Sequence, residues 1–291
     1  MPTEVASGAD CDVPVAHLAA FVLVTLAVSG GVAAATIVET VSSVTTIPIM
    51  LAPALLAIVL RQIQGYSVRR TVVGSLRGAT ARSVAFAVGF PVAFIALAAV
   101  VALSTGLGTY NPGGGEFSYV GPVVLFPVFL LFAGILSYGE ELGRRGYLLP
   151  ALTERVGPIV ATVIVGIVWA LYHFPALYFG ARATGLGDPV TTAVIQMGAV
   201  LAVAAFPFSY AYYLSEGSVL PPVVLHLTWN LLNPFVLGNV YTNVEGFIAG
   251  QVILISGEGL LGLAIGIPTL AVVALLIRQR RFFGTAPRPE G

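Results

Sequence analysis

Eight apolar stretches, each long enough to cross a lipid bilayer as a helix, dominate this sequence. A membrane-spanning helix needs about 20 predominantly apolar residues. Only 9% of the residues are charged and 57% are hydrophobic, whereas soluble domains carry about 25% charged residues. The sequence therefore predicts an all-α, polytopic membrane helical bundle with about eight transmembrane helices, which makes it a multi-pass protein of the cell membrane. The stretches lie at about 15–38, 44–61, 83–104, 119–148, 157–179, 190–214, 219–238 and 256–277.

The basic residues predict how the chain is oriented in the bilayer. The chain has no lysine, and the arginines gather beside the loops that follow the second, fourth and eighth stretches, with Arg182 alone on the other side. Because cytoplasmic loops are enriched in basic residues, we expect both termini in the cytoplasm. We expect one integral membrane domain over 1–291, with a disordered tail at 282–291. The net charge of zero argues against a nucleic-acid partner.

Two adjacent glutamates end the fourth apolar stretch. Glu140 and Glu141 are followed, four residues on in each case, by Arg144 and Arg145. On a helix this spacing pairs Glu140 with Arg144 and Glu141 with Arg145. The pairs could sit at the end of a span and extend to the lipid headgroups. Alternatively, they could form a carboxylate base beside an organising arginine, because carboxylates at membrane depth are costly and mark functional sites.

Two more polar motifs occur in later apolar stretches. Trp169 and His173 are one helical turn apart, and so are His226 and Asn230 in the run HLTWN. Each motif alone is compatible with packing or with hydrogen bonding between helices. Taken together with the glutamates, these residues come from three different stretches and can converge on one buried cavity. Such a set offers the base, the bound water and the oxyanion donor that amide hydrolysis requires.

Three runs in this order, EELGRRGYLLPAL, WALYH and HLTWN, resemble the motifs of the CPBP family. That family includes the type II CAAX prenyl proteases and bacterial Abi-like proteins linked to bacteriocin processing or self-immunity. The resemblance covers about 119–238, which we expect to be the catalytic core. It implies an intramembrane endopeptidase that hydrolyses a bond in a peptide or prenylated peptide substrate.

The resemblance also implies roles for individual residues. Glu140 would activate a water, which His173 would help to hold. His226 and Asn230 would stabilise the tetrahedral oxyanion. The supporting residues would be Glu141, Arg145 and Trp169. If the reaction uses zinc, His173 and His226 could be ligands together with a glutamate and a water, although a metal-free mechanism through Glu140 fits these residues equally well.

Arg144 departs from the family pattern, which usually has an apolar residue at this position. A cation one turn from Glu140 would favour the charged carboxylate and make it a weaker base, unless Arg144 points to the headgroups. Two other functions therefore stay open: a catalytically silent scaffold or immunity protein that binds a peptide in the same cavity, and a proton-coupled transporter. Glu258, near the start of the eighth stretch, has no assigned role.

The predicted depths of the candidate residues disagree. With straight spans and a rise of about 1.5 Å per residue, Glu140 lies roughly 12–15 Å from the cytoplasmic end of its span, His226 about 10 Å and His173 about 24 Å. A kink, a tilt or a different span boundary must close this gap if the residues form one site.

Overall fold

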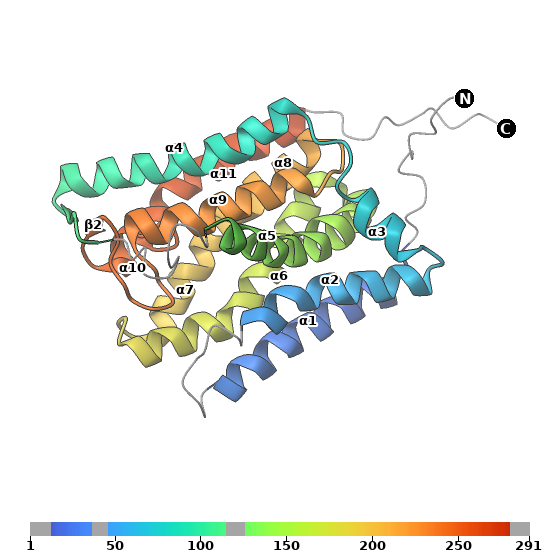
Figure 1. The fold of residues 1–291 in the computed structure, drawn as a ribbon, viewed down its shortest axis with the longest axis horizontal. Helices are drawn as coiled ribbons and strands as arrows, with labels where there is room; N and C mark the ends of the chain where they lie inside the picture. Colours follow the sequence, from blue (N-terminus) through green and yellow to red (C-terminus); the bar gives the residue numbers. More distant parts are fainter. Residues whose placement is uncertain (1–12, 37–45, 115–125, 280–291) are drawn as a thin grey trace.

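The computed structural model describes residues 13–36, 46–114 and 126–279, and these form a helical bundle (Figure 1). The only strands in these ranges are the short antiparallel pair β1 (Thr109–Tyr110) and β2 (Ile248–Ala249). This confirms the predicted all-α class. The helices are α1 (Val15–Thr36), α2 (Thr46–Ile63), α3 (Val68–Gly74), α4 (Ala81–Thr105), α5 (Phe126–Gly143), η4 (Arg144–Leu148), α6 (Leu149–Thr184), α7 (Pro189–Ala199), η5 (Val200–Ala205), α8 (Phe206–Leu214), α9 (Leu220–Leu237), α10 (Val252–Ile255) and α11 (Leu260–Gln279).

Apolar helices long enough to cross a membrane account for most of the bundle. The described part of the chain has 6 such helices, with the shorter apolar helix Ile47–Ile63 in addition. One of the 6, Phe126–Thr184, passes through the bundle twice because it folds back on itself. The protein is thus a polytopic membrane protein, and the predicted number of about eight passes agrees with this arrangement. The predicted tail at 282–291 lies outside the described residues.

Both ends of the described chain lie at the same end of the bundle. Arg155, in the turn region of α6, donates a hydrogen bond from Nη2 to the carbonyl of Val13. Arg278, near the end of α11, lines the same apolar groove as Gly157. An even number of passes requires this placement, while the cytoplasmic location of that end stays a prediction.

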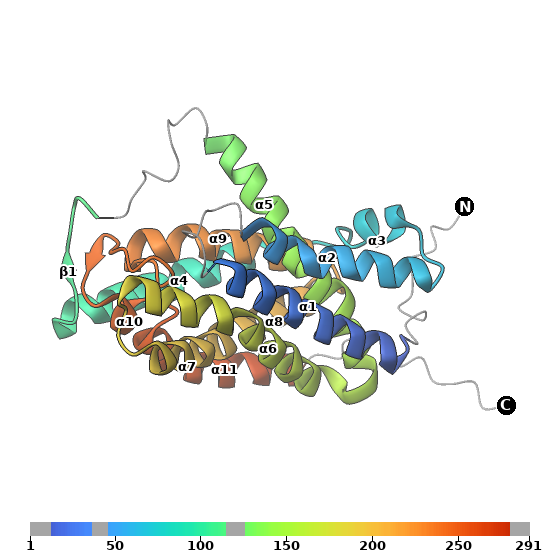
Figure 2. The same ribbon diagram turned by 90° about the horizontal axis from the view of Figure 1, so that it is seen from below.

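The segment from α5 to α6 folds back on itself as a helical hairpin (Figure 2), and the helix is interrupted at Gly157. Gly157 has φ 78, a conformation that glycine adopts without steric cost. Arg145 and Trp169, equally far from Gly157 along the chain, meet with the guanidinium 4.3 Å from the ring centroid. The sequence predicted a break between the fourth and fifth spans at about 148–157; the structure places the break at Gly157 and continues helix through 149–156.

The hairpin also removes the predicted disagreement in depth. At about 1.5 Å per residue, Glu140 and His173 each lie roughly 25 Å from the reversal at Gly157. His226 joins them although it is close to the start of α9, because α9 begins inside the protein. Ser218 and Val219, directly before α9, are both 0% exposed, and the Val219 N–H donates to the Ser75 carbonyl at 2.7 Å.

The two halves of α5 differ in their surroundings. The first half projects from the bundle (Figure 2), and its residues Val128 and Leu131 are more than half exposed. The second half packs on α2 through Gly139 and Gly143. A Cβ atom at Gly143 would lie 2.4 Å from Cβ of Pro53, and one at Gly139 would lie 2.6 Å from the Met50 carbonyl oxygen. Glycine at both positions therefore lets α2 approach the turn that carries Glu140 and Glu141.

Candidate active site

The two glutamates occupy the last turn of α5, and the two arginines open the π-helical segment η4. π-Helical turns are rare and occur frequently at functional sites. All four side chains are almost fully buried: Glu140 and Arg144 are 2% exposed, and Glu141 and Arg145 are 0% exposed. The alternative in which these charges extend to the headgroups is therefore wrong, because Arg144 and Arg145 lie inside the bundle.

Glu141, Arg145 and His226 form a connected ion-pair network. Arg145 Nη1 donates to both carboxylate oxygens of Glu141, at 3.1 Å and 2.9 Å. His226 Nδ1 lies 3.0 Å from Glu141 Oε1. Because an ionised carboxylate only accepts hydrogen bonds, Nδ1 carries the proton of this contact. The contact fixes the ring so that His226 Nε2 faces Glu140, 3.9 Å from Oε2.

Glu140 and Arg144 form a second pair beside the first. Arg144 Nη1 contacts Glu140 Oε2 at short range. The guanidinium lies over two aromatic rings, 4.6 Å from the centroid of Trp169 and 4.9 Å from that of Tyr172. Cation–π contacts of this kind hold an arginine more firmly when it is shielded from water. Arg144, which departs from the family pattern, is therefore a component of the cluster and touches the candidate base directly.

His173 reaches the same cluster from α6. Its Nδ1 lies 2.9 Å from the carbonyl oxygen of Trp169, and since a carbonyl only accepts, Nδ1 again carries the proton. The ring of Trp169 is 5.7 Å from the ring of His173 and also 5.7 Å from that of His226. Glu140 interacts electrostatically with both histidines. In the neutral ring of His173, Nε2 is left free to accept a hydrogen bond.

Asn230 is the predicted residue that does not join the cluster. Its side chain is exposed, and it makes no hydrogen bond to any residue in the described ranges. The buried asparagine of α9 is Asn233, which is 2% exposed. Asn233 Oδ1 accepts the backbone N–H of Gly257 at 2.9 Å, and its Nδ2 donates to Ser256 Oγ at 3.2 Å. The role of Asn230 therefore stays a prediction.

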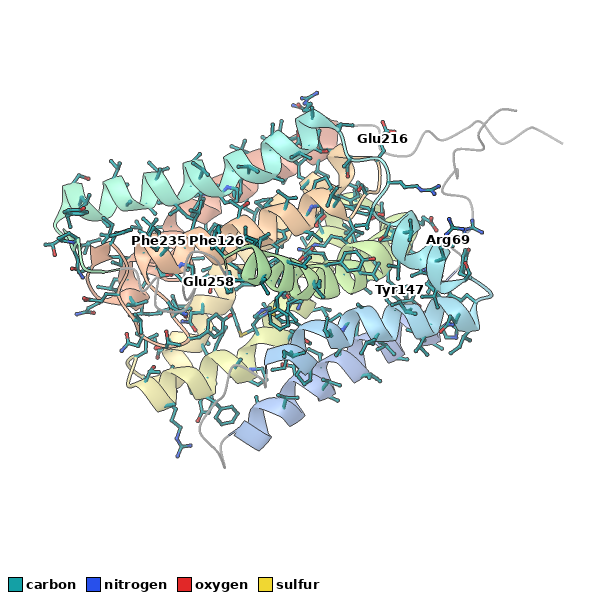
Figure 3. The ribbon with its side chains drawn as sticks, viewed as in Figure 1. Arg69, Phe126, Tyr147, Glu216, Phe235 and Glu258 are labelled. Atoms are coloured by element: carbon teal, nitrogen blue, oxygen red, sulfur yellow. The ribbon has the colours of Figure 1, made fainter. Side chains whose placement is uncertain are left out.

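Glu258, which had no assigned role and is labelled in Figure 3, contacts the HLTWN motif. Its Oε1 accepts a hydrogen bond from Trp229 Nε1 at 2.9 Å. Together with Asn233, this contact fixes the turn before α11 on α9. The sequence did contain the signal for this arrangement, since Trp229 and Asn233 follow His226 by three and seven residues and so share its helical face.

The described residues do not fit a zinc ion. A catalytic zinc site needs three protein ligands and an open position for water. In 13–36, 46–114 and 126–279, no three His, Cys, Asp or Glu side chains come together in an arrangement that could hold a metal ion. His173 and His226 each use Nδ1 for a hydrogen bond within the protein, and Nε2 of His226 faces Glu140.

Comparison with known proteins identifies the segment that carries this cluster. Residues 119–232 match the family described as "Type II CAAX prenyl endopeptidase Rce1-like". The resemblance to the CPBP family is thereby confirmed. A relative, the CAAX prenyl protease 2 of Methanococcus maripaludis, is 35% identical over 95 residues, which are 30% of this chain and 34% of the relative. The match thus spans about a third of the length of this relative.

Proposed function

We propose that this CPBP-family protein is an intramembrane endopeptidase that hydrolyses a peptide bond with a water activated by Glu140. The observation that carries the proposal is the contact of Glu140 with His226, whose ring orientation is fixed by Glu141. The family match supports a CAAX-type protease. The substrate would be a peptide or prenylated peptide that reaches the site from the lipid bilayer.

Glu140 offers one carboxylate oxygen for a water. Oε2 is held by Arg144, whereas Oε1 accepts no hydrogen bond from any described residue. A water on Oε1 would also be able to donate to Nε2 of His173, since Nδ1 of that ring carries the proton. Glu140 would take a proton from this water while the oxygen attacks the carbonyl carbon of the substrate.

His226 is suited to the other half of the reaction. When the ring also carries a proton on Nε2, that N–H can donate to the oxyanion of the tetrahedral intermediate. The Glu141–Arg145 pair would act through His226 by fixing its ring. Collapse of the intermediate breaks the C–N bond, and the proton held by Glu140 passes to the leaving amine.

A second candidate is a catalytically silent protein that binds a peptide in the same cluster. The ion pair of Glu140 with Arg144 favours it, because a cation in contact with the base stabilises the charged carboxylate and weakens its basicity. On this view the motif residues would bind a peptide without cleaving it.

Cleavage of a panel of fluorogenic peptides, prenylated and plain, tests the choice. We expect the purified full-length protein to cleave at least one peptide and Glu140→Gln to lose the activity by about 1,000-fold or more, since both the base and its charge are removed. Glu216→Gln is the matched control, because Glu216 is an exposed glutamate at the far end of the bundle (Figure 3).

The outcomes separate the candidates. Full activity of Glu140→Gln would reject Glu140 as the base. Loss of cleavage under a chelator, with recovery on adding zinc, would reject the metal-free reaction. A folded wild-type protein that binds the peptides with unchanged termini favours the silent binder.

A further inference from the structure

Arg144 has an unused hydrogen-bond donor inside the cluster. Its Nη2 is fully buried and has no hydrogen-bond partner among the described residues. Leaving a buried donor unsatisfied costs about 1–3 kcal/mol, and more for a charged group. Since Arg144 is stacked on Trp169 and Tyr172, its guanidinium cannot rotate away to find another partner without losing these contacts. The position therefore presents an N–H group that lacks an acceptor.

The location of Arg144 Nη2 indicates which acceptor could bind to it. Arg144 Nη1, on the same planar guanidinium, is bonded to the carboxylate of Glu140. A carbonyl attacked by a water on Glu140 would lie within about 3–3.5 Å of that water. Its oxygen would then be near Nη2, which is rigidly joined to Nη1. Arginine donors aimed at the place where negative charge develops are a known means of stabilising transition states.

Asn230 does not supply this donor in the described structure. Its side chain is exposed, whereas Arg144 is 2% exposed and in contact with the base. His173, on α6, is half-buried. Arg144 is thus buried against the candidate base, whereas Asn230 lies on the surface of α9.

We propose that Arg144 is a further catalytic residue, whose Nη2–H donates to the oxyanion formed from the scissile carbonyl. The inference rests on the proposed function. As the water oxygen bonds to the carbonyl carbon, the carbonyl π electrons move to the oxygen, and the charge is stabilised by Arg144 Nη2–H together with the N–H donor proposed for His226. When the C–N bond breaks, the electrons return to the carbonyl and Nη2 is released.

If Arg144 stabilises the oxyanion, removing it changes kcat in the opposite direction from that expected if Arg144 only weakens the base. As an oxyanion donor, Arg144 stabilises the transition state more than the bound substrate, so its loss lowers kcat and leaves KM nearly unchanged. As a mere brake on Glu140, its loss raises kcat. The same variant therefore distinguishes the two roles.

The test compares Arg144→Gln and Arg144→Lys with the wild-type protein, all checked for a cooperative thermal transition. We expect Arg144→Gln to lower kcat by about 100- to 1,000-fold, as removal of an oxyanion donor does, with KM changed by less than about threefold. Arg144→Lys keeps the charge without the planar fork, and we expect it to recover part of kcat. A higher kcat in either variant would overturn the proposal.

A binding measurement tests the role of Arg144 even if a variant is inactive for another reason, because binding does not require turnover. The probe is a peptide in which a phosphinate replaces the scissile amide, because this group is a tetrahedral anion like the intermediate. We expect the wild type to bind the phosphinate at least about 100-fold more tightly than the uncleaved amide, and Arg144→Gln or, if that variant does not fold, Arg144→Lys to reduce this preference at least about tenfold.

Two results of the binding measurement are distinguishable. If the wild type prefers the phosphinate but both variants keep the full preference, the role of Arg144 is wrong and the proposed hydrolysis stands. If the wild type neither cleaves peptides nor prefers the phosphinate over the amide, the proposed function itself is wrong, and the role of Arg144 falls with it.

Discussion

Two glutamate–arginine pairs lie next to each other in this protein with the same spacing, and their surroundings differ. Arg145 uses Nη1 for both oxygens of Glu141 and places Nη2 3.5 Å from the Ala204 carbonyl, which leaves only its Nε without a partner. Arg144 holds one oxygen of Glu140 and leaves Nη2 free. Chemically identical pairs thus differ in how fully they are satisfied by their neighbours.

The difference indicates that the two pairs have different roles. A buried ion pair in which both carboxylate oxygens are hydrogen-bonded is costly to break, whereas it adds little stability compared with apolar residues of similar volume. The Glu141–Arg145 pair therefore acts as a rigid support, and it also fixes His226. The Glu140–Arg144 pair keeps one oxygen and one nitrogen unsatisfied, which is the condition that a reacting group needs.

The largest expected effect is a difference in the free energy of unfolding between variants that remove one arginine or the other. Arg145→Leu leaves Glu141 buried and unpaired, and we expect it to lower the free energy of unfolding by about 3–5 kcal/mol. Arg144→Leu should lower it less, because Oε1 of Glu140 already has no protein partner. Thermal unfolding in detergent measures both, and the double variant Glu141→Gln with Arg145→Leu should recover part of the loss. Equal losses for Arg144→Leu and Arg145→Leu would contradict the different roles of the two pairs.

A smaller effect is expected for the Glu141–Arg145 pair, where Glu141 is proposed to orient His226 without reacting itself. Glu141→Gln keeps the shape of the side chain but weakens its hold on the ring of His226. We expect cleavage to fall by about 10- to 100-fold, the usual effect of removing the partner that orients a functional histidine. The measurement is kcat with the folded fraction determined in parallel, and Glu216→Gln is again the control. Unchanged kcat in a folded Glu141→Gln protein would show that His226 needs no such anchor.

The contact between α5 and α2 supports both glutamate–arginine pairs, so a substitution in this contact should affect both pairs. Gly143→Ala places a methyl group against Pro53, and we expect a loss of about 1–3 kcal/mol from overpacking. Gly134→Ala is the matched control, because no atom lies within 4 Å of the added methyl and alanine is the better helix former. Thermal unfolding that ranks Gly134→Ala as the more damaging change would mean that the close contact does not position the cluster.

The smallest effect concerns a surface carboxylate without an arginine. Asp188 caps α7 by accepting the Thr191 N–H at 2.8 Å, and this hydrogen bond lowers the pKa of Asp188. Asp188→Ala should lower the Tm by about 2 °C near neutral pH. Because the pKa is lowered on folding, the cap contributes stability above the unfolded pKa and loses it as the pH falls. The difference in Tm between the two proteins should therefore shrink below about pH 4; a constant difference would contradict the role of the charge.

The sequence was sufficient to predict the class of fold and most members of the cluster. Apolar length predicted the passes, and the i to i+4 spacing predicted both ion pairs. It did not predict that helix continues through 149–156, because Arg155 and Gly157 are typical of a loop when burial is unknown. The orientations of Arg144 and Asn230 depend on which neighbouring helices surround them, namely α6 with its two aromatic rings for Arg144 and the open side of α9 for Asn230. Spacing along one helix does not contain this information.

The reversal at Gly157 has a consequence for the order in which the site is assembled during synthesis. Glu140, Arg144 and Trp169 belong to a single hairpin, so their contacts need no part of the chain that is made later. His226 belongs to α9, which enters the membrane after α6, α7 and α8. A nascent chain that has folded only as far as the hairpin therefore already has Glu140 paired with Arg144 and Glu141 paired with Arg145, whereas it still lacks His226, the second partner of Glu141. The proposed hydrolysis, which depends on His226, would therefore begin only when α9 has been made.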